Sequence, residues 1–189
     1  MTAGDVEVIR GKINSKLAVS YDGTDDELQI NAMAVARNTA NDTVGTFSFW
    51  FLPDNITGTY GLIAFGDAVG GAAETLLIQQ AANDIRVYGR SQGAAGFDFI
   101  TTSAALVANT WVHITVVQDG VKPRIYIDGE LVAATETVAT NATHWFNDFT
   151  GLDEARIGCR TLNGGEDQFL LGVMGPVKYW EVNLYADEV

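Results

Sequence analysis

The sequence predicts an all-β protein, a sandwich of two antiparallel sheets folded as a jelly roll. Apolar residues alternate with a period of two in short runs, and no stretch repeats at the helical period of 3.6. Turn signals such as Asp119-Gly120 and Asp128-Gly129 separate these runs. The chain is 47% hydrophobic and 19% charged, which excludes a disordered or low-complexity protein. Its 189 residues are enough for one core.

The strands are expected wherever an alternating run lies between two turn signals. In chain order they are Val6–Ile13, Leu17–Tyr21, Glu27–Ile30, Thr46–Leu52, Leu62–Phe65, Thr75–Gln79, Ile85–Tyr88, Phe97–Thr101, Trp111–Val117, Arg124–Ile127, Ala155–Cys159, Phe169–Val173 and Val177–Val182. The alanine-rich stretch Asn31–Ala40 and the tail Ala186–Val189 are each expected to form a turn of helix.

Alternation assigns a face to each side chain of the longer strands. In Thr46–Leu52, three phenylalanines share one face, which is expected to enter the core, whereas Trp50 points the other way. In Trp111–Val117 the aliphatic residues face inward and His113 faces outward. The run Arg124–Ile127 follows through a predicted hairpin, with Arg124 and Tyr126 outward.

Charge and cysteine content exclude several classes of partner and site. The formal net charge is −13, so nucleic acid and membranes, which are both anionic, are not expected partners. Cys159 is the single cysteine, which excludes an intramolecular disulfide and a thiolate-rich zinc site.

Five motifs in order carry a resemblance to a known family. They are Tyr21-Asp22-Gly23-Thr24-Asp25-Asp26, Phe47-Ser48-Phe49-Trp50-Phe51, Trp111-Val112-His113-Ile114-Thr115-Val116-Val117-Gln118-Asp119-Gly120, Ile125-Tyr126-Ile127-Asp128-Gly129-Glu130-Leu131-Val132 and Arg156-Ile157-Gly158. Their order resembles the laminin-G-like branch of the concanavalin A-like lectin/glucanase superfamily. The resemblance covers residues 17–189 and implies one curved jelly-roll domain with a rim of loops. Residues 1–16 lie outside it and are expected to form an N-terminal strand or arm that could serve in docking.

The resemblance admits enzymes, but the residues they need are missing. The glucanase branch places carboxyls on one strand as Glu-x-Asp-x-Glu, and the alginate-lyase branch uses a Gln-Ile-His strand; neither run is present. Residues 89–93 match G-x-S-x-G, yet a strand follows at Phe97, so a hairpin turn fits better than a nucleophile elbow. The chain is therefore expected not to be an enzyme.

Calcium is the one cofactor that the resemblance suggests. Relatives often hold a structural calcium between the early Asp-Gly loop and an aspartate of the last strands. The candidate ligands here are Asp22, Asp25 and Asp26, because carboxylate oxygens suit calcium. The aspartate of the last strands is replaced by Gly175, and Asp22 also fits a plain turn residue.

Outward aromatic and planar polar side chains are the candidates for a glycan-binding face, because sugars stack on flat rings. They are Trp50, Trp111, His113, Arg124 and Tyr126. The two tryptophans also match framework positions, where an indole packs beneath a loop. A second set, Trp145, Phe146 and Phe149, would suit a partner contact if exposed and would anchor its loop if buried.

These features favour a non-catalytic recognition or structural module. The Met1 start, the lack of an apolar leader and the single cysteine predict folding in a reducing cytoplasm. The first hypothesis is a virion-surface component of a bacteriophage, either a head decoration or a tail-associated protein, made in the host cytoplasm. Its partners would be other virion proteins or copies of itself, with cell-surface glycans as further partners.

The alternative hypothesis is a glycan-binding, lectin-like module of a secreted or cell-surface protein, located outside the cell. A glycan-cleaving enzyme comes third.

Overall fold

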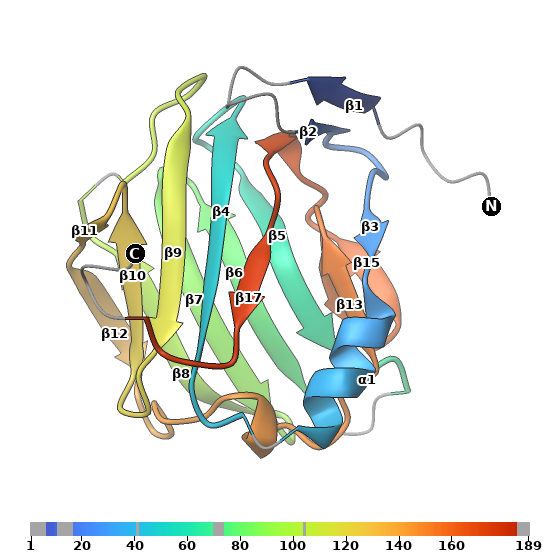
Figure 1. Cartoon of the computed structure of the whole chain (residues 1–189), viewed down its shortest axis with the longest axis vertical. Helices are drawn as coiled ribbons and strands as arrows, with labels where there is room; N and C mark the ends of the chain where they lie inside the picture. The colour runs from blue at the N-terminus through green and yellow to red at the C-terminus, as the bar shows by residue number, and fades with distance from the viewer. Residues whose placement is uncertain (1–6, 11–16, 41, 70–73, 104, 185–189) are drawn as a thin grey trace.

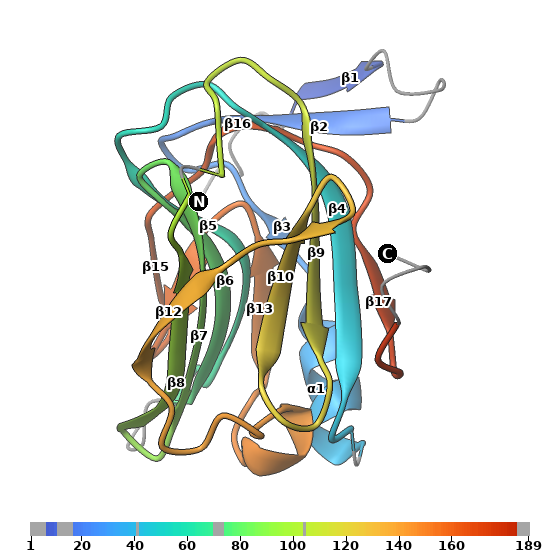
Figure 2. The ribbon, with the colours of Figure 1, turned by 90° about the vertical axis from the view of Figure 1, so that its left-hand side faces the viewer.

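The computed structural model describes residues 7–10, 17–40, 42–69, 74–103 and 105–184, and it confirms the β-sandwich. Two large antiparallel sheets lie face to face (Figure 2). The described helices are α1 (Asn31–Thr39) and the short 3₁₀ turn η1 (Phe146–Asp148). Neither is long and apolar enough to cross a lipid bilayer.

The two sheets are built from strands that are mostly far apart in sequence. The first follows the order β1 (Glu7–Arg10), β2 (Leu17–Asp22), β16 (Leu171–Met174), β4 (Gly45–Pro53), β9 (Val112–Gln118), β10 (Pro123–Ile127) and β11 (Glu130–Leu131), and β17 (Lys178–Trp180) also pairs with β4. The second follows the order β12 (Ala134–Val138), β8 (Ala94–Thr101), β7 (Asp84–Ser91), β6 (Thr75–Ala81), β5 (Thr59–Gly66), β13 (Glu154–Ile157) and β3 (Leu28–Gln29). We call them the eight-stranded and the seven-stranded sheet.

The core between the sheets holds the side chains that alternation assigned to it. The three phenylalanines of β4, Phe47, Phe49 and Phe51, are buried. Phe47 meets Phe65 of the facing sheet, with ring centroids 5.9 Å apart. Burying each such ring contributes roughly 1.5–3 kcal/mol. The expectation that these rings enter the core is therefore confirmed.

Helix α1 forms where a helical turn was expected and packs against β13. Its Ala34 is completely buried. Asn31 at its first turn accepts hydrogen bonds at Oδ1 from the backbone N–H of Ala155, at 2.9 Å, and from Arg156 Nη1, at 2.6 Å. The helix is thus tied to the edge of the seven-stranded sheet. The predicted C-terminal turn, Ala186–Val189, lies outside the described residues, as does part of the predicted strand Val6–Ile13.

Residues 181–184, which follow β17, cross the outer face of the eight-stranded sheet (Figure 1). Thr46 Oγ1 on β4 donates to the carbonyl of Val182 at 2.9 Å and accepts from the N–H of Leu184 at 3.0 Å. Val117, the β9 partner of Thr46, is buried although it points away from the core. One end of this outer face is therefore covered by the chain itself.

A small hairpin that the alternation did not predict lies on the outer face of the seven-stranded sheet. It consists of β14 (Arg160–Leu162) and β15 (Gly165–Asp167), and Figure 2 shows β15 outside that sheet, away from the eight-stranded one. Its first strand packs on β5 so closely that a Cβ at Gly61 would lie 2.3 Å from the nitrogen of Arg160. Glycine at position 61 therefore makes this close approach possible.

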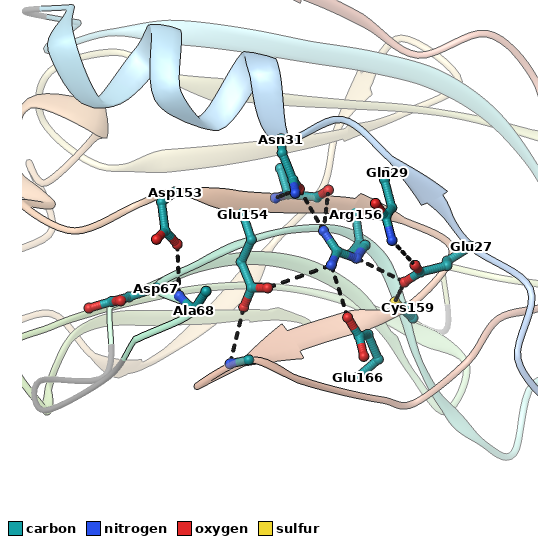
Figure 3. A network of polar contacts seen from close by, with 12 residues as sticks. Glu27, Gln29, Asn31, Asp67, Ala68, Asp153, Glu154, Arg156, Cys159 and Glu166 are labelled. Carbon is teal, nitrogen blue, oxygen red and sulfur yellow. Dashed lines mark hydrogen bonds and ion pairs between the residues drawn. The ribbon is translucent and has the colours of Figure 1, made fainter. Parts of the chain in front are cut away.

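A buried arginine fastens the hairpin to the body of the protein (Figure 3). The guanidinium of Arg156 on β13 forms ion pairs with Glu27, at 2.9 Å, and with Glu166 of β15, also at 2.9 Å. Glu154 lies 3.6 Å away and accepts the N–H of Gly164 in the hairpin turn at 3.3 Å. Because Arg156 is only 5% exposed, these charges depend on one another.

Cys159 lies at the edge of this network. Its thiol donates to Glu27 Oε2 at 3.3 Å, and burial together with that carboxylate raises the pKa of the thiol. The side chain is thus a protonated, buried group.

Gly61→Ala is expected to lower the free energy of unfolding by about 1–3 kcal/mol, because the added methyl group must displace the backbone of β14. Chemical denaturation would measure this. Gly165→Ala is the matched control, since its Cβ would meet only the Leu162 carbonyl at 3.6 Å, and it is expected to change stability by less than about 0.5 kcal/mol. Equal effects of the two variants would contradict the close-approach role of Gly61.

Arg156→Met is expected to lower the free energy of unfolding by about 3 kcal/mol, because it leaves the buried carboxylate of Glu154 and the partly buried one of Glu27 without their cation. The control is Arg124→Met, which removes the exposed partner of the ion pair with Asp119 and is expected to cost no more than about 1 kcal/mol. Urea titrations of both variants test the difference. A cost for Arg156→Met no larger than that of the control would show that the network does not hold the hairpin.

Candidate functional site

The structure brings two of the predicted glycan-face residues into direct contact on the eight-stranded sheet. Trp50 and His113 are cross-strand neighbours on β4 and β9, with ring centroids 5.1 Å apart. His113 Nε2 lies 2.7 Å from the hydroxyl of Ser48, and burial lowers the pKa of His113. Trp50 remains 36% exposed. Trp50 and His113 thus form a small aromatic patch, and Nε2 of His113 already has a hydrogen-bond partner within the chain.

The other three residues of that predicted face do not join the patch. Tyr126 pairs with Thr115 and is only 5% exposed, so its ring offers little area to a ligand. Arg124 is exposed and forms an ion pair with Asp119 at 2.6 Å. Trp111 precedes β9 and is half-buried. The five side chains share a sheet face but do not converge on one site.

The aromatic residues predicted either to contact a partner or to anchor a loop are buried. Trp145, Phe146 and Phe149 lie in and beside η1 with almost no exposed surface. The indole N–H of Trp145 donates to the hydroxyl of Tyr179 at 3.2 Å, and Phe146 packs edge-on against Phe65. These rings therefore anchor the loop in the core and offer no surface to a partner.

The three predicted calcium ligands do lie together. Ligand oxygens of Asp22, Asp25 and Asp26 are within 4.8 Å of one another, a donor set of the chemistry that calcium prefers. Asp22 accepts the N–H of Thr24 at 2.8 Å, and Asp26 accepts the N–H of Asp22 at 3.0 Å. The same carboxylates thus shape an acidic turn, and calcium stays a prediction.

The outer face of the seven-stranded sheet carries two adjoining pockets, neither of which was predicted. The smaller, about 170 Å³, we call the arginine pocket; it is lined by Thr75, Leu77, Gln79, Arg86, Tyr88, Arg90, Arg160 and Leu162. The larger, about 440 Å³, we call the polar pocket; it is lined by Thr59, Gln79, Ala81, Arg86, Asp98, Ile100, Thr137 and Gln168. Because Gln79 and Arg86 border both, the two pockets form one groove.

Strand alternation and the hairpin together produce this groove. On β7, Ile85 and Val87 are buried in the core, so the alternate residues Arg86 and Tyr88 point outward. The cross-strand partner of Arg86 on β6 is Gln79. Strand β14 adds Arg160 from above the sheet and forms a wall of the arginine pocket. The floor thus comes from neighbouring strands, and the wall comes from a distant segment.

Three guanidinium groups gather in the arginine pocket although the chain as a whole is acidic, and one of them has no carboxylate partner in the described chain. Its lining holds three of the 11 basic residues and no carboxylate. Arg86 binds Asp98 through two hydrogen bonds of 2.6 Å, which raise the pKa of the guanidinium. Arg160 is held in the same two-pronged way by Asp167. Arg90 has no hydrogen bond or ion pair among the described residues, so its guanidinium is available to a ligand.

The groove floor also contains polar groups that the described parts of the chain leave unsatisfied. Gln79 is only 2% exposed, yet its side-chain amide makes no hydrogen bond within those parts. The hydroxyl of Thr75 is likewise buried without a partner. Buried polar groups are nearly always paired, so unpaired groups that line a pocket mark a place where solvent or a bound ligand supplies the partner.

One signal for this site was present in the sequence. Residues Arg86, Tyr88 and Arg90 alternate with core residues, which places two cations and a ring on one strand face. The match to G-x-S-x-G lies at the end of the same strand. The structure confirms the hairpin there: Ser91 pairs with Ala94, and Gln92 and Gly93 have positive φ angles of 49° and 80°.

Solved structures with the same fold include carbohydrate-binding modules and sialidases. The CBM40 module of Ruminococcus gnavus IT-sialidase, bound to α2,3-sialyllactose, matches with a TM-score of 0.73 and 14% identity over 97% of this chain and 93% of that one. NanB sialidase from Streptococcus pneumoniae matches with a TM-score of 0.71 and 16% identity over 89% of this chain. The leech intramolecular trans-sialidase matches with a TM-score of 0.72 and 17% identity over 90% of this chain.

In each of these two enzymes the match spans only 26% of the enzyme chain. At these identities the likeness shows the fold alone. No curated protein sequence matches the chain.

Family membership follows from the sequence itself. A family model described as the concanavalin A-like lectin/glucanases superfamily matches residues 22–189, which is most of the chain. That range contains both sheets apart from β1 and nearly all of β2, and it contains the hairpin that walls the groove. The protein therefore belongs to the laminin-G-like family of the concanavalin A-like lectin/glucanase superfamily.

Proposed function

We propose that this chain is a non-catalytic glycan-binding module and that the groove on its seven-stranded sheet is the binding site. The observation that carries the proposal is the arginine pocket: three guanidinium groups in a hollow of a protein with a net charge of −13. The site therefore differs from the predicted face of Trp50 and His113 and lies on the opposite sheet.

The chemistry of the pocket suits an acidic sugar. A guanidinium binds a carboxylate or a sulfate through two parallel hydrogen bonds, and Arg90 is free to do so. The unpaired amide of Gln79 can bond a sugar hydroxyl, and the ring of Tyr88 can face the apolar side of a sugar. Sialyllactose, the ligand in the CBM40 structure, carries one carboxylate, which supports the choice of acidic glycans.

Binding rather than cleavage is supported by the carboxyl groups of the groove. Glycoside cleavage ordinarily uses two carboxyls about 5 to 9.5 Å apart. The described lining contains one, Asp98, and both of its oxygens accept hydrogen bonds from Arg86. Asp98 is thus placed to orient Arg86.

The virion-surface role stays a prediction, and so does a docking role for residues 1–16. Strand β1, which pairs with β2 at the edge of the eight-stranded sheet, is the described part of that arm. Glycan binding by the groove would be compatible with either location, a particle or a secreted protein.

Arg90→Ala is expected to weaken binding to acidic glycans about tenfold or more, because it removes a charge-assisted hydrogen-bond donor that has no other partner. A glycan array of sialylated, glucuronylated and sulfated sugars, with lactose as the neutral control, would identify the ligand class. Isothermal titration calorimetry of the best ligand would then give the affinities.

Trp50→Ala and Arg124→Ala are the matched controls, since both lie on the other sheet. They are expected to leave the affinity unchanged. Weakened binding in Trp50→Ala with full binding in Arg90→Ala would overturn the assignment of the groove, and no binding by the unmodified protein would overturn the proposed function.

A further inference from the structure

We infer that the polar pocket is a second sugar subsite, which takes an uncharged sugar joined to the acidic sugar in the arginine pocket. The inference rests on the proposed function and deepens it. The ligand would then be an acidic glycan of at least two sugars, with its charged sugar in the arginine pocket and its neutral sugar in the polar pocket.

The dimensions of the groove support two subsites. The arginine pocket has a volume of about 170 Å³, whereas the polar pocket, at about 440 Å³, is the larger part of the groove. The two meet at Gln79 and Arg86 without an intervening residue in their linings. A sugar bound at the arginines therefore has room for its neighbour on one side.

The lining of the polar pocket matches a neutral sugar. Its only charged groups, Arg86 and Asp98, neutralise each other through their paired hydrogen bonds. Thr59 and Thr137 bring hydroxyls from opposite sides, β5 and β12, and Ile100 brings an apolar surface from β8. Hydroxyls with a small apolar area are what a sugar ring, with its own hydroxyls and C–H face, requires.

Gln168 contributes a buried amide oxygen without a partner to the polar pocket, and its backbone is held in place by β5. Its side-chain Oε1 is buried without a hydrogen-bond partner and belongs to the polar pocket lining. Its carbonyl accepts the N–H of Gly61 at 2.8 Å, and its φ of 52° lies in the left-handed region that non-glycine residues rarely adopt. The contact with β5 thus holds this residue at the wall, where its amide oxygen can accept a hydrogen bond from a ligand.

Gln79 connects the two subsites. It borders both pockets, and its amide offers two donor hydrogens and one acceptor oxygen, none of them used by the described chain. One side chain can therefore bond both sugars, on either side of the glycosidic linkage. The amide is therefore available to a ligand at the centre of the groove.

The test compares short and extended acidic sugars by calorimetry. The probes are N-acetylneuraminic acid with 3′-sialyllactose, and glucuronic acid with the hyaluronan disaccharide. Thr137→Val and Thr59→Val each remove one hydroxyl of the polar pocket and keep the side-chain shape. In the pair that binds, each variant is expected to weaken the extended sugar about three- to tenfold and to leave the single sugar unchanged. Arg90→Ala is expected to weaken both sugars of the pair.

The outcomes separate this inference from the proposed function. If both threonine variants bind the extended sugar as the unmodified protein does, or weaken both sugars equally, the second subsite is wrong while the arginine pocket stands. If Arg90→Ala leaves both sugars unaffected, or no probe binds the unmodified protein, the proposed site itself fails and the inference fails with it. Melting temperatures of the variants, expected to be unchanged because Thr59 and Thr137 are exposed, confirm that each is folded.

Discussion

The docking of the β14–β15 hairpin onto the seven-stranded sheet is the constraint on which the groove depends. Without the hairpin, β5 and β6 would present an open sheet face, and Arg160 would not stand beside Arg86. Two features make the docking possible: the absent side chain at Gly61 and the buried ion network of Arg156. The first avoids a steric clash, and the second joins the hairpin to β13, to Glu27 just before β3 and to α1.

The carboxylates around the groove organise its cations. Asp98 and Asp167 each hold one arginine in a two-pronged contact, which fixes the guanidinium planes before any ligand arrives. A ligand that meets a preorganised site loses less side-chain entropy of the protein on binding. The acidic excess of the chain therefore does not argue against an anionic ligand, because the local field is set by where the charges lie.

Alternation in the sequence predicted most strands and the inward phenylalanines, since period two is a local property of each strand. It did not predict the edge strands β11 and β12, or β14 and β15, which have only three residues each. The pockets were also missed, because Arg160 and Gln168 reach them only through the folded hairpin. The sequence places Tyr126 on the surface and leaves a surface position open for Trp145, but both are buried. Segments distant in sequence cover them, and such burial does not appear in the alternation of a single strand.

Both outer faces contain a buried hydroxyl without a partner, Thr115 on the eight-stranded sheet and Thr75 on the seven-stranded one, but only the second lies in a groove together with unpaired cationic and amide groups. On the eight-stranded sheet, His113 is bonded to Ser48 and Thr46 to the chain after β17, so a ligand would have to displace contacts already made. On the seven-stranded sheet, Gln79, Thr75 and Arg90 have no such contacts among the described residues, and they face a hollow. Folding ordinarily satisfies every buried polar group that it can. Buried polar atoms without a partner also occur elsewhere in the described chain, for example at Tyr21 and Asn38. The groove differs because Thr75 and Gln168 line one hollow together with the unpaired guanidinium of Arg90, and a bound ligand would satisfy all three.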